Sequence, residues 1–291
     1  MTESPAAVVA TYATLRWHSL APLPTPRSHL SAVAVGEQIF VVGGFTSGTV
    51  TGSSAFERYE IATNSWNALP ALPMAIDHTA TAALSSSVYV FGGSFAQPVT
   101  DSYRFDLSTG RWTRVTSLLT ARAAGGAAVL GGRIYIVGGF DASRKELASI
   151  EAYDPAAGTW ARVGDLPTPR EHLAVVTYRD MICALGGHFG SGQPTDRIDC
   201  LAPGTGQWTT LPAMPHPSTD FSAAVIGEKI WTAGDYVEVF DGARWWDGPP
   251  LDVPRFGLAL ATDGRSLFAI GGAARRPAPD GLVDLLAVGS P

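Results

Sequence analysis

An internal repeat constrains the fold of this chain more than any other feature of its sequence. Two strand-like apolar stretches end in a diglycine, and a tryptophan follows about two dozen residues later. The first glycines of these pairs, with a degenerate Gly-Asp copy at 234, are Gly43, Gly92, Gly138, Gly186, Gly234 and Gly271. The tryptophans in step with them are Trp17, Trp66, Trp112, Trp160, Trp208 and Trp246. A regular period of about 48 residues predicts an array of six structural repeats.

Each repeat has the pattern of four short β-strands. In the first repeat we expect strands at residues 30–35, 38–42 and 55–60, and a fourth strand around Trp66. Apolar and polar residues alternate along the third strand, and glycine in the connecting turns can supply the positive φ that tight turns require. Helical periodicity is nearly absent, so the chain belongs to the all-β class.

A period of about 48 residues with four strands, a diglycine and a following tryptophan resembles the kelch repeat. The resemblance covers almost the whole chain. Kelch units form the blades of a β-propeller around a central channel. The resemblance therefore implies a six-bladed kelch-type β-propeller with four antiparallel strands in each blade.

The repeats also predict the blade boundaries and the way in which the ring closes. Blades one to six are expected at about residues 27–70, 76–117, 122–165, 170–212, 218–248 and 255–288, after a flexible N-terminus of residues 1–11. The last repeat lacks an outer strand, whereas residues 12–20 precede the first repeat and contain Trp17. We expect this N-terminal strand to complete blade six, because closure removes the exposed edges of an open array.

Composition excludes several classes of partner. Lys+Arg 20 against Asp+Glu 26 gives a net charge of −6, so nucleic acid and anionic membrane surfaces are not expected as partners. The first residues lack the basic segment of a signal peptide, and no stretch approaches the roughly 18 apolar residues of a membrane span. These features predict a cytoplasmic protein with reduced thiols.

The two cysteines are expected to be neighbours on adjacent strands of blade four. The hairpin between the second and third strands places Cys183 opposite Cys200, at a Cβ separation of about 4.5–5.5 Å. Two buried thiols that pack in the core are the expectation, and a redox pair is the alternative.

Three sets of equivalent positions are predicted to surround one mouth of the channel. The first set, 14 residues before each diglycine, is His29, His78, Ala124, His172, Asp220 and Gly257. The second set, two residues earlier, is Arg27, Ile76, Arg122, Arg170, Ser218 and Arg255. The third set, just after the diglycines, is Phe45, Ser94, Phe140, His188, Tyr236 and Ala273. Polar, cationic and aromatic groups at one end of an apolar body are typical of a ligand pocket.

The first set contains the predicted catalytic residues His29, His78, His172 and Asp220. Three neutral imidazoles and a carboxylate can act in acid–base catalysis. The three histidines are also candidate ligands of a divalent metal such as Zn, Fe or Cu. The alternative is structural, because a histidine at this position can simply hydrogen-bond a loop carbonyl.

Ligand-binding residues are predicted in the other two sets. Arg27, Arg122, Arg170 and Arg255 could hold a carboxylate or phosphate by bidentate contacts, or they could instead bind backbone carbonyls between the blades. The remaining predicted ligand-binding residues are Phe45, Phe140, His188, Asp235 and Tyr236. Asp235 and Tyr236 adjoin blade five, where the loop between the second and third strands is missing and an opening in the rim is expected.

Two functions remain open at this point. The first is a propeller that binds a small polar or anionic ligand at the channel mouth, with isomerase, cyclase or lyase chemistry assisted by acid–base groups or a metal. The alternative is a protein-interaction propeller that grips a partner with Phe45, Phe95, Phe140 and Phe189. An enzyme should have a deep, narrow cavity lined by the histidines, and an interaction surface should be broad and shallow.

Overall fold

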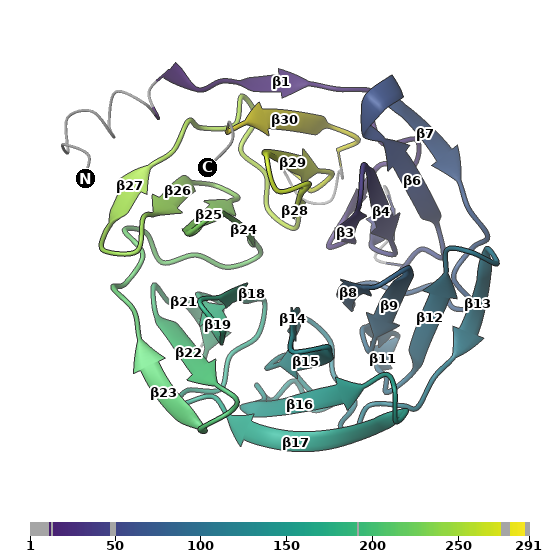
Figure 1. The fold of residues 1–291 in the computed structure, drawn as a ribbon, viewed down its shortest axis with the longest axis vertical. Helices are drawn as coiled ribbons and strands as arrows, with labels where there is room; N and C mark the ends of the chain where they lie inside the picture. Colours follow the sequence, from purple (N-terminus) through teal and green to yellow (C-terminus); the bar gives the residue numbers. More distant parts are fainter. Residues whose placement is uncertain (1–11, 13, 47–50, 191, 275–279, 289–291) are drawn as a thin grey trace.

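The computed structural model describes residues 12, 14–46, 51–190, 192–274 and 280–288, so the predicted flexible segment 1–11 lies outside the described residues. Within the described part, six four-stranded antiparallel sheets surround a central channel (Figure 1). One edge strand of each sheet lines the channel, and these six inner strands are β3 (Ser31–Val35), β8 (Ala80–Leu84), β14 (Gly126–Leu130), β18 (Ala174–Tyr178), β24 (Ser222–Ile226) and β28 (Ala259–Thr262) (Figure 1). The predicted six-bladed, all-β propeller is confirmed.

The strands of each blade follow one another from the channel outward. Blade one contains β3 (Ser31–Val35), β4 (Gln38–Val42), β6 (Phe56–Glu60) and β7 (Ser65–Ala68). Blade two contains β8 (Ala80–Leu84), β9 (Ser87–Phe91), β12 (Ser102–Asp106) and β13 (Arg111–Arg114). Blade three contains β14 (Gly126–Leu130), β15 (Arg133–Val137), β16 (Ser149–Asp154) and β17 (Thr159–Asp165). Blade four contains β18 (Ala174–Tyr178), β19 (Met181–Leu185), β22 (Ile198–Ala202) and β23 (Gln207–Thr210). Blade five contains β24 (Ser222–Ile226), β25 (Lys229–Ala233), β26 (Val237–Phe240) and β27 (Trp245–Asp247).

Blade six is built from both ends of the chain. It contains β28 (Ala259–Thr262), β29 (Ser266–Ile270), β30 (Val283–Ala287) and β1 (Trp17–Ser19). Strand β1 pairs antiparallel with β30, and Trp17 lies opposite Leu286. The predicted closure of the ring by the N-terminal strand is therefore confirmed.

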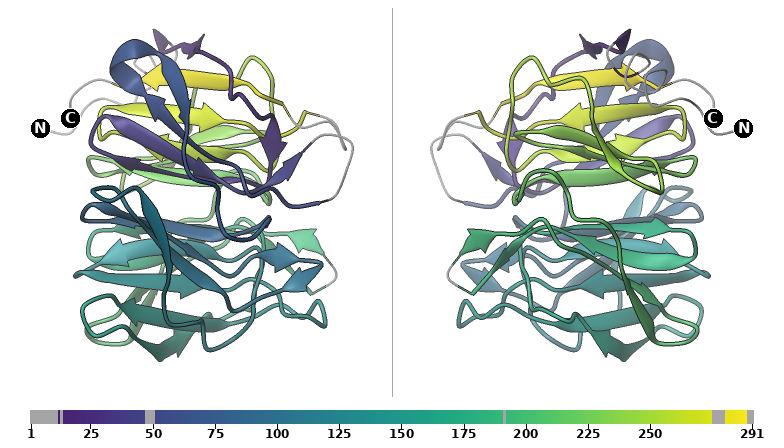
Figure 2. Two further views of the ribbon diagram at one scale, coloured as in Figure 1. Left: turned by 90° about the vertical axis from the view of Figure 1, so that its right-hand side faces the viewer. Right: turned by 90° about the vertical axis from the view of Figure 1, so that its left-hand side faces the viewer.

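Short hairpins project from one face of the body, which Figure 2 shows edge-on. The hairpins are β10 (Ser94–Phe95) with β11 (Gln97–Pro98) and β20 (His188–Phe189) with β21 (Gln193–Pro194). A further two-stranded sheet pairs β2 (Arg27–Ser28) with β5 (Phe45–Thr46), although β3 and β4 lie between them in the chain. Blade five has no such hairpin, because β25 ends at Ala233 and β26 already begins at Val237. The short 3₁₀ helix η1 (Ile61–Thr63) precedes β7. In the described residues, no helix has the length and apolar character that a bilayer crossing would need.

The hydrophobic core lies between neighbouring blades. Phe40 and Phe56 of blade one, for example, pack with Val90 and Phe105 of blade two. Neighbouring blades cover both faces of each sheet. The second strand of a blade is therefore apolar at nearly every position, as the fully buried β9 illustrates.

Tryptophans of several outer strands donate a hydrogen bond to the segment that crosses from one blade to the next. The indole N–H of Trp112 donates to the Pro70 carbonyl at 2.8 Å, and the N–H of Trp160 donates to the Thr116 carbonyl at 2.8 Å. In blade five the equivalent bond comes from Trp245, whose N–H donates to the Pro212 carbonyl at 2.9 Å. The assignment of Trp246 to this repeat position was wrong by one residue. Trp246 donates instead to Asp241.

The diglycines allow a close approach between blades. Gly43 has φ 64°, and a Cβ atom built on it would lie 2.8 Å from the Ile76 carbonyl oxygen in the next blade. No side chain fits at that distance, so the repeated glycine has a steric cause. Gly234 and Asp235 do not have positive φ, which explains why blade five tolerates aspartate here.

The cysteines are neighbours as expected, but they are bonded to each other. Cys183 lies opposite Cys200 on β19 and β22, and the two residues form a disulfide between buried side chains. The prediction of two reduced thiols is therefore wrong. Directly opposed residues of adjacent strands bring their side chains close enough for this bond. A lasting disulfide is typical of oxidising compartments rather than of the cytosol.

The disulfide leads to a direct prediction for the purified protein. In denaturant without reductant, a thiol reagent should detect no free cysteine, because both cysteines of the chain are in the bond. After reduction it should detect both. The double variant Cys183→Ala/Cys200→Ala should lose about 2–4 kcal/mol of folding free energy. Two reactive thiols before reduction would contradict the bond.

Candidate functional site

Six equivalent residues form a closed ring of backbone hydrogen bonds around the channel. We call them the channel ring, and they are His29, His78, Ala124, His172, Asp220 and Gly257. Each N–H donates to the carbonyl of the equivalent residue in the preceding blade, at N···O distances of 2.6–3.2 Å. All six have a left-handed backbone, with φ between 51° and 62°. Histidine and aspartate adopt this conformation more readily than most residues, and glycine does so without cost.

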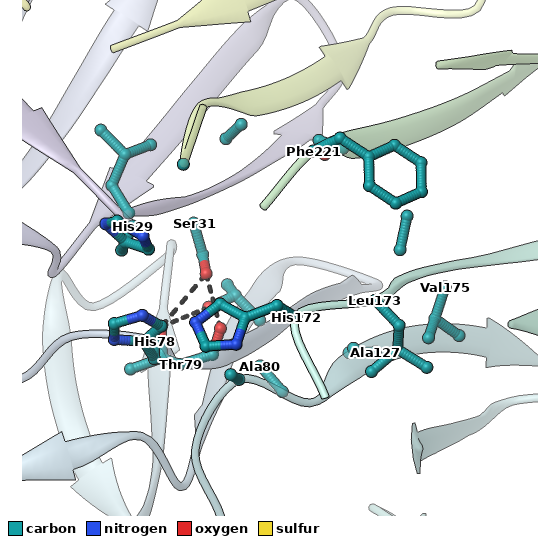
Figure 3. A pocket seen from close by; sticks show the side chains of 18 of the residues that line it. His29, Ser31, His78, Thr79, Ala80, Ala127, His172, Leu173, Val175 and Phe221 are labelled. Carbon is teal, nitrogen blue, oxygen red and sulfur yellow. Dashed lines mark hydrogen bonds between the residues drawn. The ribbon is translucent and has the colours of Figure 1, made fainter. Parts of the chain in front are cut away.

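Four side chains of the channel ring converge on the axis. The ligating atoms of His29, His78, His172 and Asp220 all lie within 4.8 Å of one another. Asp220 Oδ1 lies 3.0 Å from His29 Nε2 and 3.4 Å from His172 Nε2. The centroids of the His29 and His78 rings are 4.4 Å apart. Figure 3 shows the three imidazoles facing one another across the channel.

The side chain of the residue before each histidine contacts Nδ1 of the imidazole ring. Nδ1 of His29 contacts the Ser28 hydroxyl at 3.2 Å, and Nδ1 of His78 contacts an Asp77 oxygen at 2.6 Å. The Nδ1 atom of His172 is bound in the same way by the carboxylate of Glu171. A partner at Nδ1 determines ring orientation and leaves Nε2 aimed at the axis.

The channel beneath these side chains contains a cavity of about 260 Å³. Its wall is polar on one side, where the Ser31 hydroxyl donates to the Thr79 carbonyl at 2.7 Å (Figure 3). On the opposite side it is apolar, with Val175 and Phe221 among its lining residues. The volume of the cavity corresponds to a small molecule rather than to a peptide.

Burial controls the charge of the cluster. It lowers the pKa of His172 to about 3, and the attraction of Asp220 opposes this shift only in part. Burial by itself would raise the pKa of Asp220, but the hydrogen bond from His29 and the nearby imidazoles outweigh it and hold this pKa below its ordinary value. Burial raises the pKa of Asp77 to about 7, against the charges of His29 and Arg144. At neutral pH, His172 is therefore a neutral imidazole and Asp220 a carboxylate.

Two of the predicted aromatic residues pack directly against the histidines. The Phe45 ring lies 5.4 Å from the His29 ring and 5.2 Å from the His78 ring, centroid to centroid. Phe140 is buried and stacks on His172 at 6.1 Å. These rings form part of the wall around the cluster, and this packing restricts the imidazoles to few orientations.

The other predicted ligand-binding residues divide between two places. His188 joins the cluster from its edge, since its Nδ1 lies 3.0 Å from Glu171 Oε1 and its ring 5.8 Å from that of His172. Tyr236 instead stacks on His216 at 3.8 Å, and Asp235 beside it is exposed. His188 therefore lies beside His172 at the channel, whereas Tyr236 packs against His216 outside the channel ring.

Comparison with known proteins identifies the family. A sequence profile described as the KLHDC2/KLHL20/DRC7 Kelch-repeats domain matches residues 30–234, well over half of the chain. The chain belongs to the kelch-repeat family. Kelch-like protein 25 of Xenopus tropicalis is 25% identical over 140 residues, which make up 48% of this chain and only 15% of that protein. A solved structure described as "Structure of YjhT" has a TM-score of 0.80 at 17% identity, over 91% of this chain and 96% of that chain, and it shows the same fold.

The four arginines of this kelch propeller are structural. Their exposed fractions are 0–1%, and each guanidinium is paired with an acid of the third strand, in the pairs Arg27–Glu57, Arg122–Glu151, Arg170–Asp199 and Arg255–Asp284. Arg27 also donates to the Gly43 carbonyl at 2.6 Å. Their burial in these ion pairs does not fit the prediction that they bind a ligand at the mouth. The alternative, carbonyl binding between the blades, fits only in part, because the carbonyls that they bind, such as Gly43 for Arg27 and Gly138 for Arg122, belong to their own blade.

The left-handed backbone of the channel ring explains why the arginine side chains do not point to the axis. A regular strand would place residues two apart on the same side, so Arg27 was expected beside His29. His29 has φ 52°, which interrupts the alternation. Consequently the histidine points to the axis while the arginine turns into the blade.

Two further sets of residues support the site in this kelch chain and were not predicted from the sequence. The first set contains the Nδ1 partners of the histidines, which are Ser28, Asp77 and Glu171. The second set contains the acids of the buried pairs, 29 or 30 residues after each arginine. Both had a visible signal, because a polar residue precedes each channel-ring histidine and an acid recurs at one position of the third strand.

Proposed function

We propose that this kelch propeller binds a small polar or anionic molecule at the channel mouth and catalyses a rearrangement of it. One observation carries the proposal. Three imidazoles and a carboxylate from four different blades meet at a cavity of about 260 Å³. A ligand in that cavity would be within reach of all four side chains.

The chemistry of these groups suits a reaction without an external oxidant. Imidazole and carboxylate groups held close together can take a proton from one ligand atom and return a proton to another. Such a transfer serves isomerisation, cyclisation or elimination, because no electrons leave the substrate. The apolar wall around Val175 and Phe221 would exclude bulk water from the bound molecule.

The alternative function is recognition of a protein partner. Phe95 and Phe189 favour it, because they lie on the projecting hairpins β10–β11 and β20–β21 with exposed fractions of 57% and 41%. Exposed aromatic side chains are common in protein interfaces. Phe45 and Phe140 do not join this surface, since they pack against the histidines.

A thermal-shift screen tests the small-ligand proposal. The probes are small hydroxy acids, carboxylates and phosphate esters, each at a concentration well above the expected Kd. A ligand at 100 times its Kd adds about 2.7 kcal/mol of stability, which raises Tm by roughly 5–10 °C. The shift should disappear in Asp220→Asn and His29→Ala.

The matched control for this screen is the variant Phe95→Ser/Phe189→Ser, which alters only the exposed hairpins. It should keep the full ligand shift. If no probe shifts the wild type, or if Asp220→Asn responds like the wild type, the channel mouth is not the ligand site. Loss of the shift only in the double phenylalanine variant would favour the hairpin surface instead.

A further inference from the structure

We propose that His29, His78, His172 and Asp220 bind one divalent transition-metal ion through three imidazole Nε2 atoms and one carboxylate oxygen. The inference deepens the proposed function, because it assigns a cofactor to the same site. Imidazole and carboxylate donors suit Zn²⁺, Fe²⁺ or Cu²⁺, whereas Mg²⁺ and Ca²⁺ prefer sites made of oxygen alone.

The spacing of the donor atoms fits one small ion. At metal–ligand distances of about 2.0–2.1 Å, the donors of a tetrahedral zinc site lie about 3.3 Å apart. Asp220 Oδ1 lies 3.0 Å from His29 Nε2 and 3.4 Å from His172 Nε2, on either side of that value. The complete set lies within 4.8 Å, so a small rotation of the imidazoles would bring all four donors to one ion.

The surroundings of the histidines have the form of outer-shell partners in metal sites. A metal-binding histidine usually binds a carboxylate, hydroxyl or carbonyl through its second nitrogen, which orients the ring. Here Ser28, Asp77 and Glu171 each contact Nδ1 of the histidine that follows. The same local contact occurs in three blades, and in His29 and His172 it leaves Nε2 next to Asp220 Oδ1 on the axis.

This arrangement differs from that of structural histidines. A structural histidine at this position would bond a carbonyl of its own loop. The ring nitrogens of His29 and His172 instead contact side chains, and both Nε2 atoms approach the same oxygen of Asp220. Two imidazole nitrogens and one buried carboxylate oxygen thus lie close enough together to be ligands of the same ion.

A second grouping in the same region competes for one of these histidines. Glu171, His172 and His188 also lie close together, through Nδ1 of His172 rather than Nε2. We assign Glu171 as the positioning residue of His172, because Ser28 and Asp77 occupy the same place beside the other two histidines. The two groupings make opposite predictions for His188 and Asp220.

The test uses the protein of residues 1–291, stripped with a chelator and then titrated with Co²⁺ and Zn²⁺. We expect one ion per chain by calorimetry and by elemental analysis after desalting. Bound Co²⁺ should give visible absorption bands that Zn²⁺ displaces, and excess Mg²⁺ should not compete. Fewer than about 0.1 equivalents of each of Zn²⁺, Fe²⁺ and Cu²⁺ after reconstitution, with no Co²⁺ spectrum, would overturn the proposal.

Variants then locate the ion. His29→Ala, His172→Ala and Asp220→Ala should each weaken Co²⁺ binding by more than about 100-fold, and Glu171→Gln by about 10–100-fold. Alanine is tolerated in this backbone conformation, since Ala124 occupies the equivalent position with φ 54°. Circular dichroism should therefore show folded variants, and Asp220→Asn provides a second, near-isosteric change. His188→Ala and the exposed His18→Ala should bind Co²⁺ normally.

Two outcomes separate this inference from the proposed function. If neither Co²⁺ nor Zn²⁺ binds while a small ligand still shifts Tm through Asp220, the metal site is wrong and the ligand site stands. If Co²⁺ binds through the histidines while no ligand shift is found, the metal site stands and the proposed function fails. Loss of Co²⁺ binding in His188→Ala, with normal binding in Asp220→Ala, would overturn the assignment of ligands.

Discussion

A chain without residues 1–20 is expected to lose most of its folding stability, because blade six then lacks its outer strand. Trp17 is buried, and its indole N–H donates to the Pro249 carbonyl at 2.8 Å. Removing a buried tryptophan side chain costs about 3–5 kcal/mol. The deletion also exposes the edge of β30. Since domains are stable by only about 5–15 kcal/mol, we expect thermal denaturation to show a broad transition at a much lower temperature, or none.

A circular permutant provides the control for this deletion. A chain that begins after residue 20 and carries residues 12–20 behind a short linker after residue 288 restores the pairing of β1 with β30. Its Tm should lie close to that of the wild type. A deletion variant with unchanged Tm would show that β1 contributes nothing to closure. A permutant as unstable as the deletion would show that the order of the chain, not the strand, matters.

The second large effect is expected from Arg122→Met, which should destabilise the fold by about 3–5 kcal/mol. Arg122 and Glu151 are both 1% exposed and form a direct ion pair. The guanidinium also donates to the carbonyls of Gly138 and Ser149 at 2.9 Å. Without the arginine, Glu151 is a buried carboxylate without its cation. Chemical denaturation measures the loss as a lower midpoint with an unchanged m-value.

Replacing both partners should be milder than replacing one. Blade two provides the precedent, because Ile76 stands at its arginine position and Tyr103 at its acid position. We therefore expect Arg122→Met/Glu151→Met to recover much of the stability that Arg122→Met loses, since no uncompensated charge remains. A double variant at least as unstable as the single one would contradict this account. The exposed pair Arg162–Asp165 offers a control, because loss of a surface ion pair costs less than about 1 kcal/mol.

The repeat was sufficient to predict the architecture and the closure of the ring. An inner strand without insertions and a packed tryptophan recur in every blade, and a diglycine recurs in every blade except blade five, so these features repeat in the sequence at a regular distance. The exception was blade five, where two tryptophans are adjacent. Only strand pairing distinguishes them, since Phe240 lies opposite Trp245 and not Trp246.

The site was predictable as a set of equivalent positions but not as a geometry. The offset of 14 residues from the diglycine identified His29, His78, His172 and Asp220, and the structure brings their ligating atoms together. Arg27 and its equivalents, which the same offset predicts beside the histidines, lie instead inside the blades. Knowing which residues are equivalent does not establish the direction of their side chains.

Which residues are equivalent in the six blades can be read from the repeat alone, because each blade must satisfy the same steric and packing demands. The direction of their side chains depends instead on contacts between blades. The left-handed backbone of the channel ring is set by hydrogen bonds between blades, such as that from the N–H of His78 to the His29 carbonyl. That bond joins residues from different repeats, and no pattern within one repeat encodes it. It turns the histidines to the axis and the arginines into the blades.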